Sequence, residues 1–486
     1  MVREGHLPQL PLMLAGVPRL IVSLLRAVGL PTIEFPKVSL AAAGLTQYVL
    51  FDSHSPSATA RVRGVENQGV TAIDLRQLAK SVPEGLTIWT DPSSAVPDDE
   101  RFDAAAQLLD ALKLALEAAG GLWLRLGELP YPYRAVACLG VDVGASELNP
   151  AIEFAMRQSL PLTLFAAPVT RPVSLQPYLA FQAPGHGGLE WGWSLTRPGT
   201  GATARPASRW SIHAQRWKDA GCPIQGLLLS DQLAQQPSAE LTQQLGFTYQ
   251  LTSTMGCGSG RLECGRHPNR DPVRFLADQI ERAIPATPVH STRRDTSSWI
   301  LPGEESSLMF RIDSAHVLRD EFRPPRTPAA PRPSPFQTAV GTSYWKEQYQ
   351  RGMALMFVDP IDHLLAGSFD GIAALAAKCP LLWATTFGTL SRWLRQRAAC
   401  QVQVWRRENR YELRSLTDLA PGLTAELWRG NHVALLPLES DQLDVEDQGL
   451  VYQSLPAASP FGMAIPRGPL AEPQFTGRSS VRSAAS

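Results

Sequence analysis

The sequence of 486 residues has no excess of charge of either sign, because 45 Lys and Arg residues balance 45 Asp and Glu residues. Without a basic surplus there is no overall attraction to nucleic acid or to an anionic membrane, so we expect neither as a partner. Cysteine is also scarce. Its six residues are scattered along the chain, which favours free thiols over a disulfide framework.

Long apolar runs are missing as well. The chain begins MVREGHLPQLPLMLAGVP, where prolines interrupt the apolar residues and no clear cleavage site of small residues follows. The next stretch, from Pro18 to Val28, is too short to cross a bilayer and is typical of an amphipathic helix. We therefore expect a cytoplasmic protein without a transmembrane segment.

Residues 1–130 are predicted to form a small α/β domain with flavodoxin-like layering. Its strand candidates are TQYVLFDS, VTAIDL and GLTIWTD, and a long helix is expected from Arg101 to Ala119. No glycine-rich phosphate loop follows these strands, so a nucleotide-binding role has little support. The run DSHS that begins at Asp52 invites a catalytic interpretation, but we favour a polar strand-to-helix loop with capping residues.

A complete strand–helix–strand unit lies between Tyr131 and Pro168. The short apolar run from Arg134 to Val141 predicts a buried strand, a helix is expected after it, and LTLFAA predicts a second strand. Strands joined in this way are parallel, and parallel sheets bind ligands beyond the carboxyl ends of their strands. Asp142 lies at such an end and is the first candidate for chemistry.

This unit resembles the opening of the polysaccharide deacetylase (NodB homology) family, and similar segments recur downstream in the family's order. These segments are LEWGWSLTRP, CPIQGLLLSDQLAQQPSAELTQQLGFTYQLTS, MALMFVDP and PLLWATTFGTLSRWLRQR. The resemblance covers roughly residues 130 to 400. It implies an α/β fold with a distorted (β/α) barrel over residues 131–398.

The same resemblance argues against the family's reaction. Active members use an Asp base beside a metal that a second Asp and two His hold. Asp142 fits the base position, but Val143 stands where the metal-binding Asp is expected. Ser194 and Pro198 fall on the positions of the two His, and Asp359 replaces a His late in the family's pattern. Apolar side chains offer no lone pair to a metal, and water without a metal is a poor nucleophile at neutral pH. We expect no metal cofactor, with zinc or another divalent ion as the alternative.

A stretch rich in Gly, Pro, Ser and Thr, from Gly185 to Arg209, predicts an exposed loop over the barrel mouth. Trp191 and Trp193 are two residues apart, so on an extended segment they share one face and could stack on sugar rings. With His186 they are the candidate substrate-binding residues. The alternative is that the two indoles fill the core.

Asp359 ends another predicted strand, from Gly352 to Pro360, and is expected to reach the same mouth as Asp142. Two carboxylates that converge there could bind a cation or act as acid and base, as in glycoside hydrolysis. The alternative is a turn, because Asp before Pro is a common turn pair.

A separate metal hypothesis rests on Cys257, Cys264 and His267, which lie in a glycine-rich stretch. The spacing Cys-x6-Cys-x2-His matches no common zinc site, so an irregular surface loop is the alternative.

Three further segments complete the predicted organisation. The proline-rich segment 323–335 predicts an exposed loop within the barrel domain. Residues 399–465 contain short runs of alternating polarity, CQVQVWRR, RYELRSL, TAELWRG, HVALLPL and LVYQSL, which predict a C-terminal β-sandwich module. Residues 466–486 are polar and predicted to be disordered.

The function that we favour is a deacetylase-like protein without catalysis, a scaffold that binds a polysaccharide, an oligosaccharide or a protein partner. The alternative is an active carbohydrate esterase, an N- or O-deacetylase, that uses Asp142 and Asp359 with an atypical metal site. A third hypothesis is a structural subunit of a larger assembly.

Overall fold

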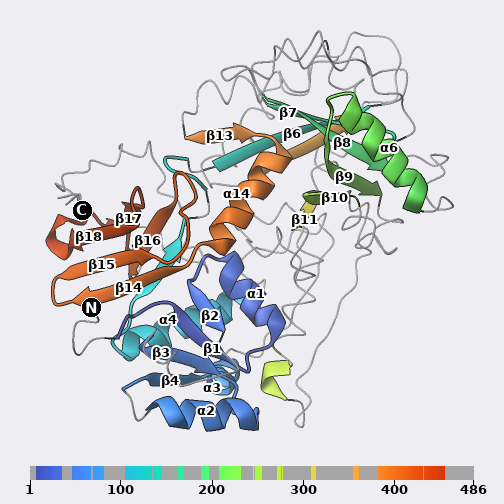
Figure 1. Ribbon diagram of the computed structural model, residues 1–486. Helices are drawn as coiled ribbons and strands as arrows, with labels where there is room; N and C mark the ends of the chain where they lie inside the picture. Colours follow the sequence, from blue (N-terminus) through green and yellow to red (C-terminus); the bar gives the residue numbers. More distant parts are fainter. Residues whose placement is uncertain are drawn as a thin grey trace, which may run out of the picture. The chain divides into compact units, whose positions relative to one another are not determined.

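The computed structural model describes two compact units (Figure 1). Unit 1 comprises Met1–Tyr131, Ser259–Ala286 and Leu394–Ser486, and unit 2 comprises Pro132–Gly258 and Thr287–Trp393. The described residues are 7–34, 46–66, 69–81, 104–127, 129–133, 135–143, 161–168, 188–195, 207–230, 247–253, 271–274, 308–312, 354–360, 381–430 and 432–454, with positions 153, 245 and 276.

The N-terminal part of unit 1 contains a four-stranded parallel sheet in the order β2-β1-β3-β4. Its strands are β1 (Leu12–Ala15), β2 (Thr32–Glu34), β3 (Tyr48–Phe51) and β4 (Thr71–Asp74). The helices that accompany them are α1 (Arg19–Ala27), α2 (Pro56–Glu66), α3 (Leu75–Ser81) and α4 (Ala104–Ala118). This part of the chain is thus a parallel sheet with helices, within a unit that also includes residues from the C-terminal part of the chain.

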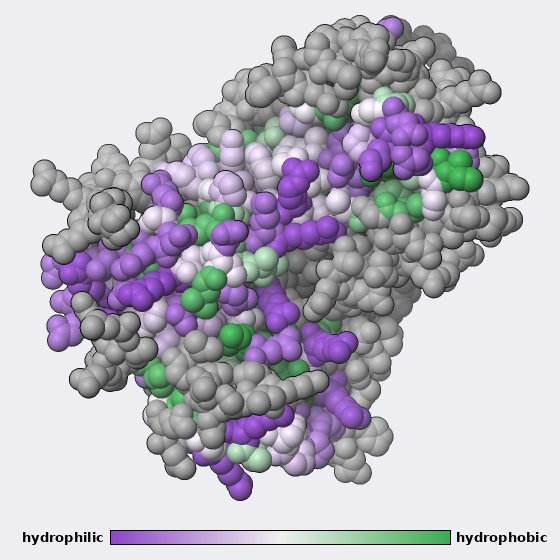
Figure 2. Space-filling view, in the orientation of Figure 1, coloured by the Kyte–Doolittle hydropathy of each residue, from purple (hydrophilic) through white to green (hydrophobic). Residues whose placement is uncertain are grey.

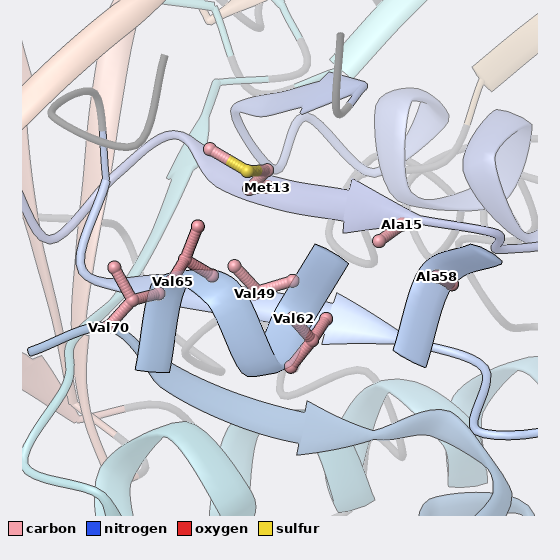
Figure 3. Close-up of a cluster of buried hydrophobic side chains, with 7 residues drawn as sticks. All are labelled: Met13, Ala15, Val49, Ala58, Val62, Val65 and Val70. Atoms are coloured by element: carbon pink, nitrogen blue, oxygen red, sulfur yellow. The ribbon is translucent and has the colours of Figure 1, made fainter. Parts of the chain in front are cut away.

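Helix α2 packs on one face of this sheet (Figure 3). Ala58, Val62 and Val65 recur at helical spacing and meet Met13 and Val49 of β1 and β3. Burying a Val side chain contributes about 1.5–3 kcal/mol, so this contact holds the helix on the sheet. The alternate residues of β1 are buried as well, which shows that both faces of the sheet are covered.

Two separate antiparallel sheets complete unit 1. One has the order β14-β15-β18, with β14 (Val402–Arg407), β15 (Arg410–Ser415) and β18 (Gln442–Glu446). The other has the order β19-β17-β16-β5, with β5 (Trp123–Leu126), β16 (Thr424–Arg429), β17 (His432–Pro437) and β19 (Gln453–Ser454). Strand β5 comes from the N-terminal half of the chain, so residues 399–465 do not build this sheet alone.

Unit 2 is built on an eight-stranded sheet in which every pairing is parallel. Its order is β11-β10-β9-β8-β7-β6-β12, and β13 also pairs with β6. The strands are β6 (Ala135–Val143), β7 (Leu162–Ala166), β8 (Leu189–Leu195), β9 (Ile224–Ser230), β10 (Tyr249–Ser253), β11 (Leu308–Ile312), β12 (Ala354–Pro360) and β13 (Leu382–Thr385). The sheet curls as half of a barrel does (Figure 1).

The prediction of an exposed loop from Gly185 to Arg209 is wrong for its first part, because Leu189–Leu195 is the buried strand β8. Gly192 does not mark a turn here. It is a strand residue that makes room for the ring of Phe165, since a Cβ there would lie 2.5 Å from that ring. After this strand and its connection comes α6 (Ala207–Asp219).

Two broader expectations can be compared with the described residues. Cys138, Cys222 and Cys400 are buried and free, as predicted for them. Within the described ranges, no helix is long and apolar enough to cross a membrane. The segments 323–335 and 466–486 lie outside those ranges.

Candidate functional site

The carboxyl end of the parallel sheet in unit 2 holds the candidate site. Asp142 is the penultimate residue of β6, opposite Phe165 of β7 and Pro360 of β12, and it is half-buried. The strand was predicted to end at Val141, but it continues to Val143. Asp142 is therefore held within the strand, and the pleat fixes the face of the sheet to which it belongs.

Strand pairing shows which other positions share the face of Asp142. Phe165 of β7 lies opposite both Asp142 and Gly192, so these three positions belong to one face. Ser194 is two residues after Gly192 in β8 and therefore belongs to that face as well. Ser230 and Ser253 lie opposite each other at the carboxyl ends of β9 and β10. Among the described positions at the carboxyl edge, the face of Asp142 therefore includes one acid and three serine positions.

The strand register separates the two acids that were expected to converge. Asp359 lies opposite Val141, and Pro360 lies opposite Asp142. Because neighbouring residues of a strand belong to opposite faces, positions 142 and 359 are assigned to different faces of the sheet. This register does not support an acid–base pair of the two carboxylates.

The residues at the family's metal positions do not form a metal site in the described structure. Val143 is buried, belongs to the face opposite Asp142, and offers no lone pair. Ser194 is buried in β8. No cluster of three or more His, Cys, Asp or Glu residues that could hold a metal occurs in the described ranges. His186, Pro198, Cys257, Cys264 and His267 lie outside those ranges.

Trp191 and Trp193 are only 2% and 0% exposed. The Trp191 ring packs 5.4 Å from that of Trp217, and the Trp193 ring packs 5.7 Å from that of Trp210, so helix α6 covers both indoles. A covered ring has no free face for a sugar. Their placement corresponds to the alternative in which the two indoles fill the core.

Sequence reasoning missed a buried carboxylate with several hydrogen-bond donors around it, that of Glu190 in β8. It accepts hydrogen bonds from the hydroxyl of Tyr249 at 2.6 Å and from the hydroxyl of Thr386 at 2.7 Å. The backbone N–H of Gly388 donates to both carboxylate oxygens at 3.0 Å, and the hydroxyl of Thr163 donates at 3.3 Å. The one signal in the sequence is an acid inside the apolar run LEWGW.

Burial dominates the electrostatics of this network. It raises the pKa of Glu190, and the hydrogen bonds from Tyr249, Thr386, Gly388 and Thr163 oppose that rise. Burial also raises the pKa of Tyr249, and the charge of Glu190 adds to this effect.

Cys138, on the same face of the sheet, shows the same effect. Its thiol pKa is well above the ordinary value because the side chain is buried and Glu190 lies near it. A thiol that stays protonated is a poor nucleophile, so we assign Cys138 to the core.

Glu190 fixes the start of helix α14 (Phe387–Ala399) against the sheet. Gly388 is the second residue of this helix, and a carboxylate at a helix N-terminus satisfies backbone N–H groups that otherwise lack partners. The adjacent Phe387 ring packs 6.0 Å from Phe165 and 5.8 Å from Tyr249. This face of the sheet is therefore filled by aromatic side chains near Glu190.

The polar run at Asp52 in unit 1 has capping roles. The carboxylate of Asp52 accepts the backbone N–H of His54 at 3.0 Å, and the hydroxyl of Ser55 accepts the backbone N–H of Ala58 at 3.4 Å at the start of α2. Asp52 also lies 3.9 Å from the guanidinium of Arg76. These contacts agree with the interpretation as a capped strand-to-helix loop.

Comparison with known proteins gives little. No family profile matches the sequence, and no curated protein is similar to it. Among solved structures, the chain is similar to the 4-alpha-glucanotransferase from Thermococcus litoralis, with 12% identity and a TM-score of 0.30. The similarity covers 53% of this chain and 40% of that structure, so less than half of that protein's length is matched.

Proposed function

We propose that this protein is a polysaccharide deacetylase-like protein that binds a glycan at the carboxyl edge of the unit 2 sheet without hydrolysing it. The finer fold belongs to the same proposal: a distorted (β/α) barrel, a flavodoxin-like N-terminal domain and a C-terminal β-sandwich. The strand order β2-β1-β3-β4 supports the flavodoxin-like assignment, because such sheets begin in the order 2-1-3-4.

One observation carries the proposal. Asp142 stands at the carboxyl end of β6, a strand that pairs with β7 and β12 in a parallel sheet, and folds of this class place their ligands at that end. Its carboxylate can accept hydrogen bonds from sugar hydroxyls, and the residues Ser194, Ser230 and Ser253 lie along the same edge. A face with one acid and three serine positions among its described residues is suited to a neutral ligand rich in hydroxyl groups.

The donor chemistry argues for binding over hydrolysis. A deacetylase of this family needs a metal to lower the pKa of its attacking water. Val143 is apolar and buried at the position of the metal-binding Asp, and Ser194 replaces a His. The described residues at these positions do not fit a metal, so we derive no step through one.

The proposal is tested by measuring oligosaccharide binding to the full-length protein by calorimetry. The probes are soluble N-acetylated chito-oligosaccharides, with and without a chelator. Asp142→Asn keeps the shape of the side chain and removes its charge, so we expect it to weaken binding about tenfold, because a charged acceptor forms hydrogen bonds about 1.5 kcal/mol stronger than a neutral one. The matched control is Asp219→Asn, at the last residue of α6 in the same unit.

We expect the chelator and Asp219→Asn to leave the affinity unchanged. Binding that is lost with the chelator would contradict a metal-independent site. Binding that is equal in the wild type and in Asp142→Asn would show that the carboxyl edge is not the binding site.

A further inference from the structure

The sheet β14-β15-β18 has two very different faces. Val402, Val404, Tyr411 and Leu413 point to its buried side, together with Leu443 and Val445 opposite them. The alternate residues form the other face, which we call the Trp405 face: Gln403, Trp405, Arg407, Arg410, Glu412, Arg414, Gln442, Asp444 and Glu446. In Figure 2, hydrophilic residues gather where Figure 1 places these strands.

Trp405 is the one apolar residue of the Trp405 face. Its side chain is partly exposed, and it lies opposite Glu412. The indole therefore lies at a charged surface and is partly in contact with water. Such a ring offers an apolar surface on which a ligand can stack.

A guanidinium lies beside the indole, and hydrogen bonds and ion pairs join it to other polar groups of the same face. The guanidinium of Arg414 lies 5.2 Å from the ring centroid, and its Nε donates to Glu412 at 2.9 Å. Glu412 also lies 3.5 Å from the guanidinium of Arg407, and the amide of Gln442 donates to it at 3.5 Å. These groups combine hydrogen-bond donors and acceptors around one aromatic ring.

The charges of the Trp405 face cancel. Arg407, Arg410 and Arg414 carry three positive charges, and Glu412, Asp444 and Glu446 carry three negative charges. Arg410 is paired with Asp444 at 3.1 Å, and Arg414 is paired with Glu412 at 2.6 Å. A polyanion such as nucleic acid gains no net attraction here.

We infer that the Trp405 face is a second glycan site, which binds a neutral oligosaccharide by stacking on Trp405 and by hydrogen bonds to its polar neighbours. This inference rests on the proposed function, since it assigns a ligand of the same class. Neighbouring strands lie about 4.8 Å apart, so the three strands give a flat face about 10 Å wide. A chain of linked sugars fits such a face better than a single small molecule, which prefers a concave pocket.

The test is calorimetric titration of the full chain with neutral hexasaccharides: chitohexaose, cellohexaose, mannohexaose and xylohexaose. We expect at least one to bind, and we expect Trp405→Ala to weaken that binding about tenfold or more, as removal of a stacking Trp does. Trp405→Phe keeps a smaller ring and should lose less. Arg406→Gln is the matched control, because Arg406 is an exposed residue of the same strand on the alternate face.

Each outcome decides the inference. If Trp405→Ala changes no titration while Asp142→Asn weakens binding, the inference is overturned and the proposed function stands. If Trp405→Ala weakens binding and Asp142→Asn does not, the Trp405 site stands and the carboxyl-edge site fails. Absence of binding to all four hexasaccharides overturns both. The binding should also be unchanged between about 50 mM and about 500 mM salt, and a steep salt dependence would indicate a charged ligand instead.

Discussion

Removal of the Glu190 carboxylate is predicted to loosen helix α14 from the parallel sheet. Glu190→Ala leaves the hydroxyls of Tyr249 and Thr386 and the N–H of Gly388 without their acceptor. Each buried donor left unsatisfied costs about 1–3 kcal/mol, and relief of the buried charge offsets part of the sum. We expect a net loss on the order of 4 kcal/mol in the free energy of unfolding of unit 2, a large share of the roughly 5–15 kcal/mol that holds a typical domain folded.

The isosteric variant separates charge from shape. Glu190→Gln keeps one carbonyl acceptor but places an NH2 group, which is a donor, where the second oxygen accepts hydrogen bonds, so a loss of about 1–2 kcal/mol is expected. Thr163→Val is the control at the edge of the network. It removes the longest hydrogen bond, at 3.3 Å, and should cost about 1 kcal/mol or less.

The pH dependence has a defined sign. Because the pKa of Glu190 is raised above its ordinary value of 4.5, the folded protein binds this proton more tightly than the unfolded chain does. The contribution of Glu190 to stability is therefore fully present below pH 4.5 and is lost as pH rises through the folded-state pKa. The wild type should gain stability relative to Glu190→Gln as pH falls from neutral toward this value.

Denaturant titrations at several pH values, followed by tryptophan fluorescence, measure these differences. Hydrogen exchange in the peptide that begins at Phe387 reports the helix start directly. A loss below about 1 kcal/mol for Glu190→Ala, with unchanged exchange at this helix, would refute the role of the carboxylate as its anchor.

Two further predictions concern buried polar contacts. Gly388→Ala should destabilise the protein, because a Cβ at this position would overlap the carboxylate of Glu190. We expect this overlap to outweigh the helix propensity of Ala, which exceeds that of Gly by about 1 kcal/mol. An increase in the thermal midpoint of unfolding would contradict this geometry. Glu426→Ala should lower the free energy of unfolding by about 3–5 kcal/mol, because the side chain of Arg125 is only 6% exposed and is bonded to Glu426 at 2.8 Å. Glu426→Gln, which keeps an acceptor, is its matched control, and equal losses in both variants would show that the acceptor does not matter.

Local patterns predicted several elements well because their signals lie in neighbouring residues. The long apolar helix before Gly120 was expected from Arg101 to Ala119 and extends over Ala104–Ala118. The alternating run CQVQVWRR contains β14, and the next run contains β15. Strand β18 was missed, because its sequence QLDVE carries polar residues at the exposed positions and few apolar ones.

The candidate site was harder to predict because it depends on contacts between distant residues. Asp142 was found from the end of an apolar run, but its relation to Asp359 depends on a one-residue difference in strand register. Glu190 meets Thr386 and Gly388 across almost two hundred residues of chain, with sequence separations of 196 and 198. No periodicity in the sequence encodes such a contact.

Glycine gave the clearest false signal. Gly192 was interpreted as part of a loop, yet it lies in a buried strand beneath Phe165, and Gly226 lies in the same way beneath Tyr249. A small residue that makes room for an aromatic ring and a small residue in a turn look alike in a single sequence. The aromatic partner that distinguishes them is on another strand.

The central claim, binding without hydrolysis, is tested most directly by acetate release from N-acetylated chito-oligosaccharides, measured together with the metal content of the purified chain. We expect no acetate above the protein-free control and no stoichiometric metal. Acetate released by the wild type and lost in Asp142→Asn, with bound metal in the preparation, would contradict it and would identify an active deacetylase.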